Sequence, residues 1–165
     1  MNKIDFSGLE KLSKEEKYKT IIPQISSLVQ GEKNLIANLA NVVSVLKYTF
    51  DYYLWVGFYF VDPESKSELV VGPFQGKVAC ARLKTGSGVC GTAVIKKETI
   101  VAEDVNAFPG HIFCDADSRS EIVVPVIKNG EVIAVLDIDS GSYSAFDKED
   151  RKYLEEIINN VINIF

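Results

Sequence analysis

Residues 120–140, SEIVVPVIKNGEVIAVLDIDS, constrain the fold more than any other stretch of the chain. Two apolar runs flank the Asn-Gly pair at 129–130, which is typical of a tight β-hairpin turn. A two-residue loop would set Glu121 opposite Ile138, and a three-residue loop would set Glu121 opposite Asp137. We favour the second register because it keeps every carboxylate of the hairpin on one face.

In that register the hairpin has one apolar face and one face that carries acids. The apolar face consists of Ile122, Val124, Val126, Val132, Ala134, Leu136 and Ile138. The other face consists of Glu121, Asp137 and Asp139 beside Val123, Pro125, Ile133 and Val135. Three carboxylates near one sheet end repel one another, so we expect at least one raised pKa unless a cation lies among them. A substrate ammonium group would be such a cation; solvated acids at strand ends are the alternative.

The remaining pattern predicts helices at both ends of the chain and strands between them. Apolar residues recur at helical spacing over 14–30, 35–46 and 148–162, the last after an N-cap at Asp147. Strands are expected over 54–62, 67–76, 77–83 and 99–105, a short helix capped by Ser87 over 87–97, and an irregular stretch over 106–118. This order of elements indicates the α+β class.

We therefore expect a mostly antiparallel sheet of five or six strands, with the N- and C-terminal helices on one face and a pocket on the other. A chain of 165 residues has the size of one domain, 1–165, in which 1–15 could form a loose N-terminal segment. The long irregular stretch would cover the pocket as a site or lid. Trp55 and Tyr59 alternate onto one strand face with Gly57 between them, and could wall a slot for a small apolar group. An ordinary aromatic core is the alternative.

Charge and hydropathy exclude several classes of partner. The net charge is −5 without a block of Lys or Arg, which argues against nucleic acid and anionic membranes. The N-terminus is polar, without the apolar segment of a secretory signal, and the run YYLWVGFYFV is too short to cross a membrane. We therefore expect a cytoplasmic protein, in which thiols stay reduced unless they are catalytic or sensing.

The three cysteines allow inert, metal-binding or redox roles. Cys80, Cys90 and Cys114 with His111 do not have the spacing of a zinc site, so we expect no metal. Cys80 suits an inert position inside an apolar strand, and Cys90 would lie in the first turn of the short helix, where its thiol is either activated or a spectator. Cys114, in the irregular stretch, is the best nucleophile, with His111 either its base or a loop hydrogen-bonder.

The segments WVGFY, GPFQGKVAC, GVCGTA, DVNAFPGHIFCDADSRSEIVVP and VLDIDS together resemble the free methionine-(R)-sulfoxide reductases, a family of stand-alone GAF-domain enzymes. The resemblance implies that Cys114 is the catalytic cysteine, that Cys80 resolves it and that Cys90 has an auxiliary role. It further implies that Glu121, Asp137 and Asp139 hold the substrate, and that Trp55 and Tyr59 surround its methyl end.

The implied reaction is the thiol-dependent reduction of free L-methionine (R)-S-oxide through a sulfenic acid and an intramolecular disulfide. A thioredoxin-type dithiol would recycle that disulfide, and the reaction needs no organic cofactor or metal. Domains of this kind are commonly homodimers. Two rival functions are a regulatory GAF module that only binds a ligand, and a thiol redox sensor that uses Cys80 and Cys114 without turnover. Phosphate ligands would favour basic groups, whereas the expected pocket face is acidic.

Overall fold

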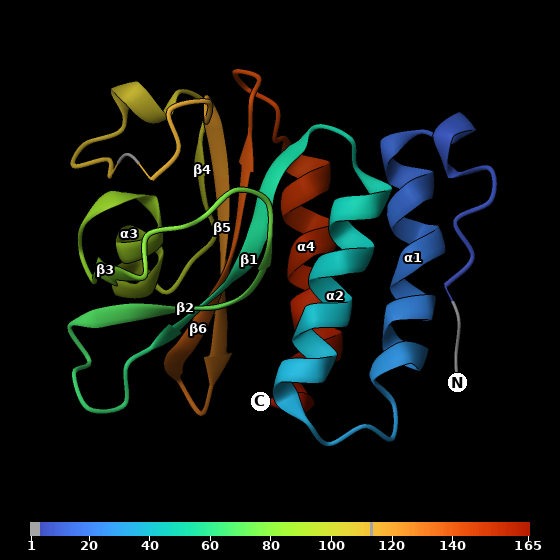
Figure 1. Cartoon of the computed structure of the whole chain (residues 1–165), viewed down its shortest axis with the longest axis horizontal. Helices are drawn as coiled ribbons and strands as arrows, with labels where there is room; N and C mark the ends of the chain where they lie inside the picture. The colour runs from blue at the N-terminus through green and yellow to red at the C-terminus, as the bar shows by residue number, and fades with distance from the viewer. Residues whose placement is uncertain (1–3, 113) are drawn as a thin grey trace.

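The computed structural model describes residues 4–112 and 114–165, which form a curled antiparallel sheet between two helical layers (Figure 1). The strands are β1 Tyr53–Val61, β2 Glu68–Gln75, β3 Arg82–Lys84, β4 Ile100–Ala102, β5 Ser120–Lys128 and β6 Glu131–Ser140. The helices are α1 Lys14–Val29, α2 Leu35–Thr49, α3 Gly88–Lys96 and α4 Lys148–Val161. The six strands lie in the order β3-β2-β1-β6-β5-β4, and all pairs are antiparallel. The prediction of a mostly antiparallel sheet of five or six strands is confirmed.

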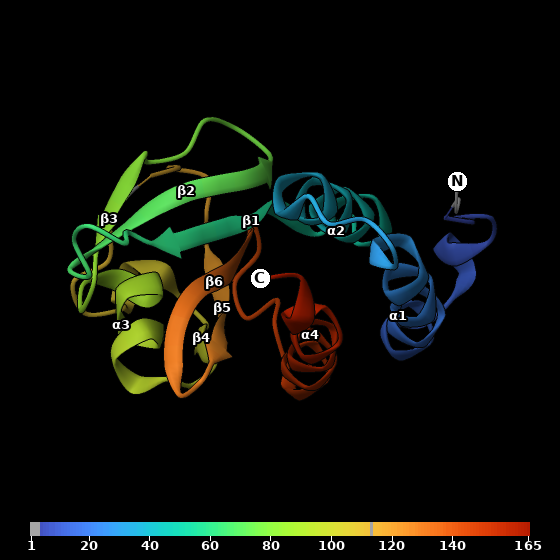
Figure 2. The same cartoon turned by 90° about the horizontal axis from the view of Figure 1, so that it is seen from below.

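The helices predicted at the two ends of the chain lie on the same side of the sheet, where α2 and α4 pack on the strands and α1 packs on α2 and α4. Figure 2 shows α1, α2 and α4 on one side, and the sheet curling around α3 on the other. The predicted N-cap Asp147 accepts hydrogen bonds from the backbone N–H groups of Glu149 and Asp150. On α4, Leu154 and Ile157 are fully buried against the sheet, and burial of each such side chain stabilises the fold by roughly 1.5–3 kcal/mol.

One buried carboxylate joins this helical layer to the sheet. Asp150 is fully buried, and its Oδ1 accepts hydrogen bonds from the hydroxyls of Tyr18, at 2.8 Å, and Tyr52, at 2.6 Å. Its Oδ2 pairs with the ammonium group of Lys14 on α1. Because a buried charge is costly unless it is paired, these contacts specify how α1, α4 and the turn before β1 meet. Among the described residues no helix is long and apolar enough to span a membrane.

The hairpin turns where the sequence predicts, but with the shorter loop. Asn129 and Gly130 both have positive φ, 53° and 80°, as a tight hairpin turn requires. Lys128 pairs with Glu131, so the loop has two residues. The prediction of a three-residue loop is therefore wrong.

A β-bulge follows the turn and changes which side chains share a face. The pairing passes from Ile127 with Val132 to Val126 with Ala134, so Ile133 is the extra residue on β6. Val132 lies on the pocket side of the sheet and Ile133 packs against the helical side, the reverse of the sequence prediction. The extra residue interrupts the alternation of side chains on its own strand.

Beyond the bulge, Glu121 lies opposite Asp139, and Val123 lies opposite Asp137. The predicted pairing of Glu121 with Asp137 is thus displaced along β6. A displacement by an even number of residues leaves every side chain on its own face. The prediction that all three carboxylates share the face away from the terminal helices is confirmed.

Two predicted strands are shorter in the structure. In place of the predicted strand 77–83 the structure has β3, Arg82–Lys84, and in place of 99–105 it has β4, Ile100–Ala102, followed by a 3₁₀ turn. Cys80 therefore lies in the loop 76–81 and not in an apolar strand, which corrects the prediction. The alternation of apolar and polar residues could not reveal this loop, because it is held by hydrogen bonds from Trp55 and Tyr59 of β1 to its backbone.

Candidate active site

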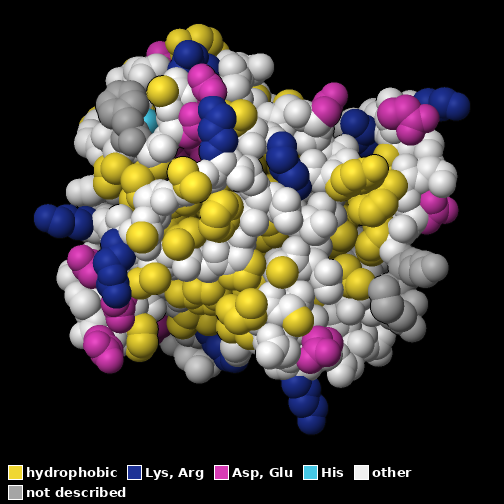
Figure 3. All heavy atoms as spheres, viewed as in Figure 1, with side chains coloured by type: hydrophobic (Ala, Val, Ile, Leu, Met, Phe, Trp, Pro, Cys, Tyr) yellow, Lys and Arg dark blue, Asp and Glu magenta, His cyan; other side chains and the backbone are white. Residues whose placement is uncertain are grey.

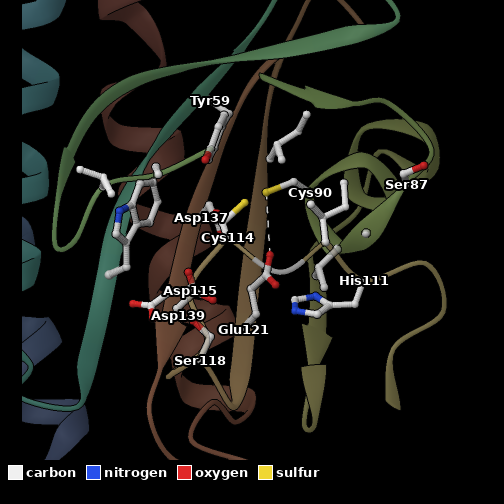
Figure 4. Close-up of a pocket in the computed structure, with 17 residues that line it drawn as sticks. Tyr59, Ser87, Cys90, His111, Cys114, Asp115, Ser118, Glu121, Asp137 and Asp139 are labelled. Atoms are coloured by element: carbon white, nitrogen blue, oxygen red, sulfur yellow. Dashed lines mark hydrogen bonds between the residues drawn. The ribbon is translucent and has the colours of Figure 1, made fainter. Parts of the chain in front are cut away.

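A pocket lies on the face of the sheet opposite the terminal helices, under α3 and the loop 106–118, as predicted. It encloses about 570 Å³ of space that no atom fills, and this figure includes open solvent. Figure 4 shows the carboxylates of β5 and β6 turned toward the thiols of the roof. The lining residues that matter for its chemistry are Trp55, Tyr59, Cys90, His111, Cys114, Asp115, Ser118, Glu121, Asp137 and Asp139.

The acid cluster occupies the floor of the pocket. Glu121 and Asp137 are each only 6% exposed, and Asp139 is half-buried. Burial is the main cause that raises the pKa of Glu121 well above its usual range, and the charges of Asp137 and Asp139 add to it. Burial likewise raises the pKa of Asp137 to about 6, and that of Asp139 well above its usual range. The expectation of at least one raised pKa is confirmed.

Among the described residues that line the pocket, none is Lys or Arg, and the pKa of His111 is lowered by burial. The Oδ1 atom of Asp137 is buried and has no hydrogen-bond partner within the described part of the chain. An unpaired buried carboxylate oxygen is costly, so this pocket suits a ligand that brings a positive charge or hydrogen-bond donors.

The raised pKa of Asp137 predicts how stability depends on pH. The folded protein holds this proton more tightly than the unfolded chain, so the stabilisation is complete below about pH 4 and is lost as the pH rises through about 6. Asparagine does not titrate, so the Asp137→Asn variant does not lose this stabilisation. Its free energy of unfolding, relative to that of the wild type, should therefore rise by on the order of 2–3 kcal/mol from pH 4 to pH 7.5. Urea unfolding of the ligand-free disulfide form at several pH values measures this difference. Parallel pH profiles for the two proteins would contradict it.

Two of the three thiols form a disulfide at the mouth of the pocket. Cys80 and Cys114 are bonded across 34 residues of sequence, with a Cα–Cα distance of 5.5 Å. Cys114 lines the pocket and belongs to an exposed part of the loop 106–118. The inert-core interpretation of Cys80 is therefore wrong, and the pair can cycle between dithiol and disulfide.

The third thiol, Cys90, is buried in the first turn of α3 and free. It is 4% exposed, and its Sγ lies 3.8 Å from Glu121 Oε1, to which it donates (Figure 4). Burial, with the nearby charges of Asp137 and Glu121, raises its pKa well above the usual value. The positive end of a helix would lower a thiol pKa, but desolvation and the carboxylates outweigh it here. Of the two alternatives for Cys90, these surroundings favour the protonated spectator over the activated thiolate. Ser87 stands at the predicted N-cap position but makes no capping hydrogen bond.

The aromatic residues of β1 wall the pocket and also hold the loop 76–81. Trp55 and Tyr59 lie on the pocket face with ring centroids 5.8 Å apart. Trp55 Nε1 donates to the carbonyl of Lys77 at 3.1 Å, and the Tyr59 hydroxyl donates to the carbonyl of Cys80 at 3.0 Å. Gly57 lies between them because a Cβ there would stand 2.5 Å from Cη2 of Trp55. The sequence predicts that these aromatic residues wall the pocket, but not that they donate hydrogen bonds to the backbone of the loop 76–81.

Sequence reasoning missed three residues of the site. Asp115 and Ser118 line the pocket next to Cys114, and Asp115 Oδ2 is buried without a hydrogen-bond partner among described residues. Lys77, outside the lining, pairs with Asp115 and Asp117. The one available signal was the cluster of acids directly after Cys114 in CDADS.

A family model of the GAF domain matches residues 38–164 of this chain. GAF domain-containing protein A of Dictyostelium discoideum is 51% identical over 94% of this chain and 96% of that protein. The curled sheet with its flanking helices is thus the fold of a GAF domain.

Two further relatives have names that state an enzymatic activity. The free methionine-R-sulfoxide reductase of Escherichia coli is 42% identical over 89% of this chain and 87% of that protein. The crystal structure of the Neisseria meningitidis free methionine-R-sulfoxide reductase in complex with its substrate is 46% identical and superimposes with a TM-score of 0.94, covering 100% of this chain and 96% of that one. The chain belongs to the family of the free methionine-R-sulfoxide reductases, as the sequence resemblance implies.

Proposed function

We propose that this protein, a single GAF domain, reduces free L-methionine (R)-S-oxide to L-methionine, with Cys114 as nucleophile and Cys80 as resolving cysteine. The observation that carries the proposal is the Cys80–Cys114 disulfide at the mouth of an acidic pocket. The preference for the R epimer follows from the relatives named above. A cytoplasmic location and a homodimer belong to the same proposal.

The reaction begins at the sulfoxide sulfur, which is electrophilic because its oxygen withdraws electrons. The thiolate of Cys114 attacks this sulfur while the oxygen takes up a proton. A carboxylic acid can donate that proton near neutral pH only if its pKa is raised, and burial raises the pKa of Glu121, Asp137 and Asp139. Methionine leaves, and Cys114 remains as a sulfenic acid.

The second half of the cycle removes the oxygen from the protein. The Cys80 thiol attacks the sulfenic sulfur of Cys114, the S–S bond forms, and the oxygen leaves as water. A thioredoxin-type dithiol then reduces the disulfide by thiol–disulfide exchange and is itself oxidised. Electrons thus pass from the external dithiol to the sulfoxide.

The acids of the floor account for a preference for the free amino acid. Free methionine sulfoxide carries an α-ammonium group that an internal peptide residue lacks. Each charged hydrogen bond from this group to Glu121, Asp137 or Asp139 would contribute about 1.5–3 kcal/mol. The slot between Trp55 and Tyr59 would then receive the apolar methyl end.

Cys80→Ser separates the two halves of the cycle. This variant should form about one methionine per protein molecule with a thioredoxin-type donor and then stop, because its sulfenic acid has no resolving thiol. Dithiothreitol, a small thiol that can reach the sulfenic acid directly, should restore turnover. Methionine is counted against protein after incubation with racemic free methionine sulfoxide.

The same count separates the proposed function from its rivals. Wild-type protein that stops after one equivalent, even with dithiothreitol, would be a redox sensor. Wild-type protein that forms no methionine would be a binding module. Sustained recycling of Cys80→Ser by the protein donor at the wild-type rate would contradict the role of Cys80.

A further inference from the structure

The two redox thiols lie on different loops that the sheet does not join. Cys80 lies on the loop 76–81 between β2 and β3, and Cys114 on the loop 106–118 between β4 and β5. Those strands stand toward opposite edges of the sheet, in the order β3-β2-β1-β6-β5-β4. When the disulfide is reduced, something other than strand pairing must keep the two sulfurs within reach.

Lys77 reaches from the first loop to the second. Its Nζ lies 3.3 Å from Oδ1 of Asp115 and also pairs with the carboxylate of Asp117. Its own carbonyl accepts the hydrogen bond from Trp55 Nε1 at 3.1 Å. The backbone of Lys77 is therefore tied to β1 while its side chain crosses to the loop that carries Cys114.

The two residues whose carboxylates accept from Lys77, Asp115 and Asp117, are linked to each other. Asp115 directly follows Cys114, and its side chain is only 14% exposed. Its Oδ1 also accepts a hydrogen bond from the backbone N–H of Asp117 at 3.0 Å, which turns both carboxylates toward the same ammonium group. Lys77 lies three residues before the resolving cysteine, and its ion-pair partners lie one and three residues after the proposed nucleophile.

We propose that Lys77 is a positioning residue that holds the two thiol-bearing loops together in the reduced protein. The proposal rests on the proposed function in one respect: the step it assists is the attack of the Cys80 thiol on the Cys114 sulfenic acid, which forms the S–S bond and releases water. Ordered loops raise the effective concentration of one sulfur at the other, so they favour formation of the disulfide.

The size of the effect follows from the exposure of the ion pairs. The side chains of Lys77 and Asp117 are 57% and 63% exposed, so their attraction is weakened by water and salt. We expect Lys77→Ala to lower the equilibrium constant for the Cys80–Cys114 disulfide against glutathione about threefold to fivefold. A tenfold change in this equilibrium constant corresponds to about 30 mV in the reduction potential, so the expected change in potential is about 15–20 mV. Salt at about 1 M, where the Debye length is about 3 Å, should reduce the wild-type constant toward that of the variant.

The experiment equilibrates each protein in glutathione redox buffers, traps free thiols by alkylation and measures the Cys80–Cys114 disulfide by mass spectrometry. Lys77→Arg should retain the wild-type equilibrium constant, because the positive charge persists. Lys77→Glu should have a lower equilibrium constant than Lys77→Ala, because Asp115 and Asp117 repel the new carboxylate. Lys96→Ala is a matched control. The Lys96 side chain is also 57% exposed, and it pairs with Glu98, 3.9 Å away, outside both thiol-bearing loops.

Equal constants for wild type and Lys77→Ala would overturn the proposal, as would failure of Lys77→Arg to retain the wild-type value. An equal decrease in Lys96→Ala would overturn it too, because any lost surface charge would then suffice. This equilibrium does not involve methionine sulfoxide. A wild-type protein that makes no methionine would therefore refute the proposed function and leave the role of Lys77 to be decided by the disulfide measurement.

Discussion

Replacement of Cys114 by serine is expected to abolish methionine formation, with a loss of roughly 10³-fold or more, because the hydroxyl is a far weaker nucleophile than a thiolate. Dithiothreitol should not restore activity, since no sulfenic acid forms in the first place. The measurement is methionine release from racemic free methionine sulfoxide. We expect this variant to be the least active of the cysteine variants.

Two controls make this result specific to the nucleophile. Cys114→Ser should still bind methionine sulfoxide, measured by calorimetry, because the acids of the pocket floor are unchanged. Cys80→Ser, which also lacks the disulfide, should remain active with dithiothreitol. Full activity of Cys114→Ser would refute the assignment of the nucleophile, and weak activity of both variants with dithiothreitol would point instead to a loss of pocket structure.

Asp137→Asn is expected to lower kcat/KM for free methionine sulfoxide by about 10²-fold or more. The Oδ1 atom of Asp137 is buried and has no hydrogen-bond partner among described residues, so in our proposal it receives the substrate ammonium group. Truncation of one member of a buried charge pair typically costs about 2–5 kcal/mol. The asparagine keeps the shape of the side chain and loses its charge, and steady-state kinetics at pH 7.5 measure the effect.

A substrate that lacks the ammonium group tests the reason for this loss. Wild-type protein should strongly prefer free methionine sulfoxide over its N-acetyl derivative, and Asp137→Asn should discriminate much less between them. Asp51→Asn, at an exposed position outside the pocket, is the matched control and should behave as wild type. An unchanged preference in Asp137→Asn would show that this carboxylate does not recognise the ammonium group.

Much of the fold could be predicted because its signals are local. The helix periodicity of 14–30 and 148–162 and the Asp147 cap depend on neighbours in the chain, and both are confirmed. The hairpin faces could be predicted because buried carboxylates on the wrong face are too costly. The bulge at Ile133 could not, because a single extra residue leaves the apolar pattern almost unchanged.

The site was predicted less completely than the fold. The acid cluster follows from one hairpin, so its members share a face in any register that segregates charge. The meeting of Cys80 and Cys114 was implied only by the family resemblance, because they are 34 residues apart and belong to separate loops. The protonation of Cys90 was left open, since helix polarity and burial act on its pKa in opposite directions.

By itself, the sequence determined which residues form helices, which turn residues close the hairpin and which side of the sheet carries acids, because these depend on spacing along one segment. Only the tertiary structure decided the burial of Cys90 beside the acids, the contacts that hold the loop 76–81 and the reach of Lys77 to Asp115. Those properties arise from burial and charge between segments distant in sequence, which no local pattern records.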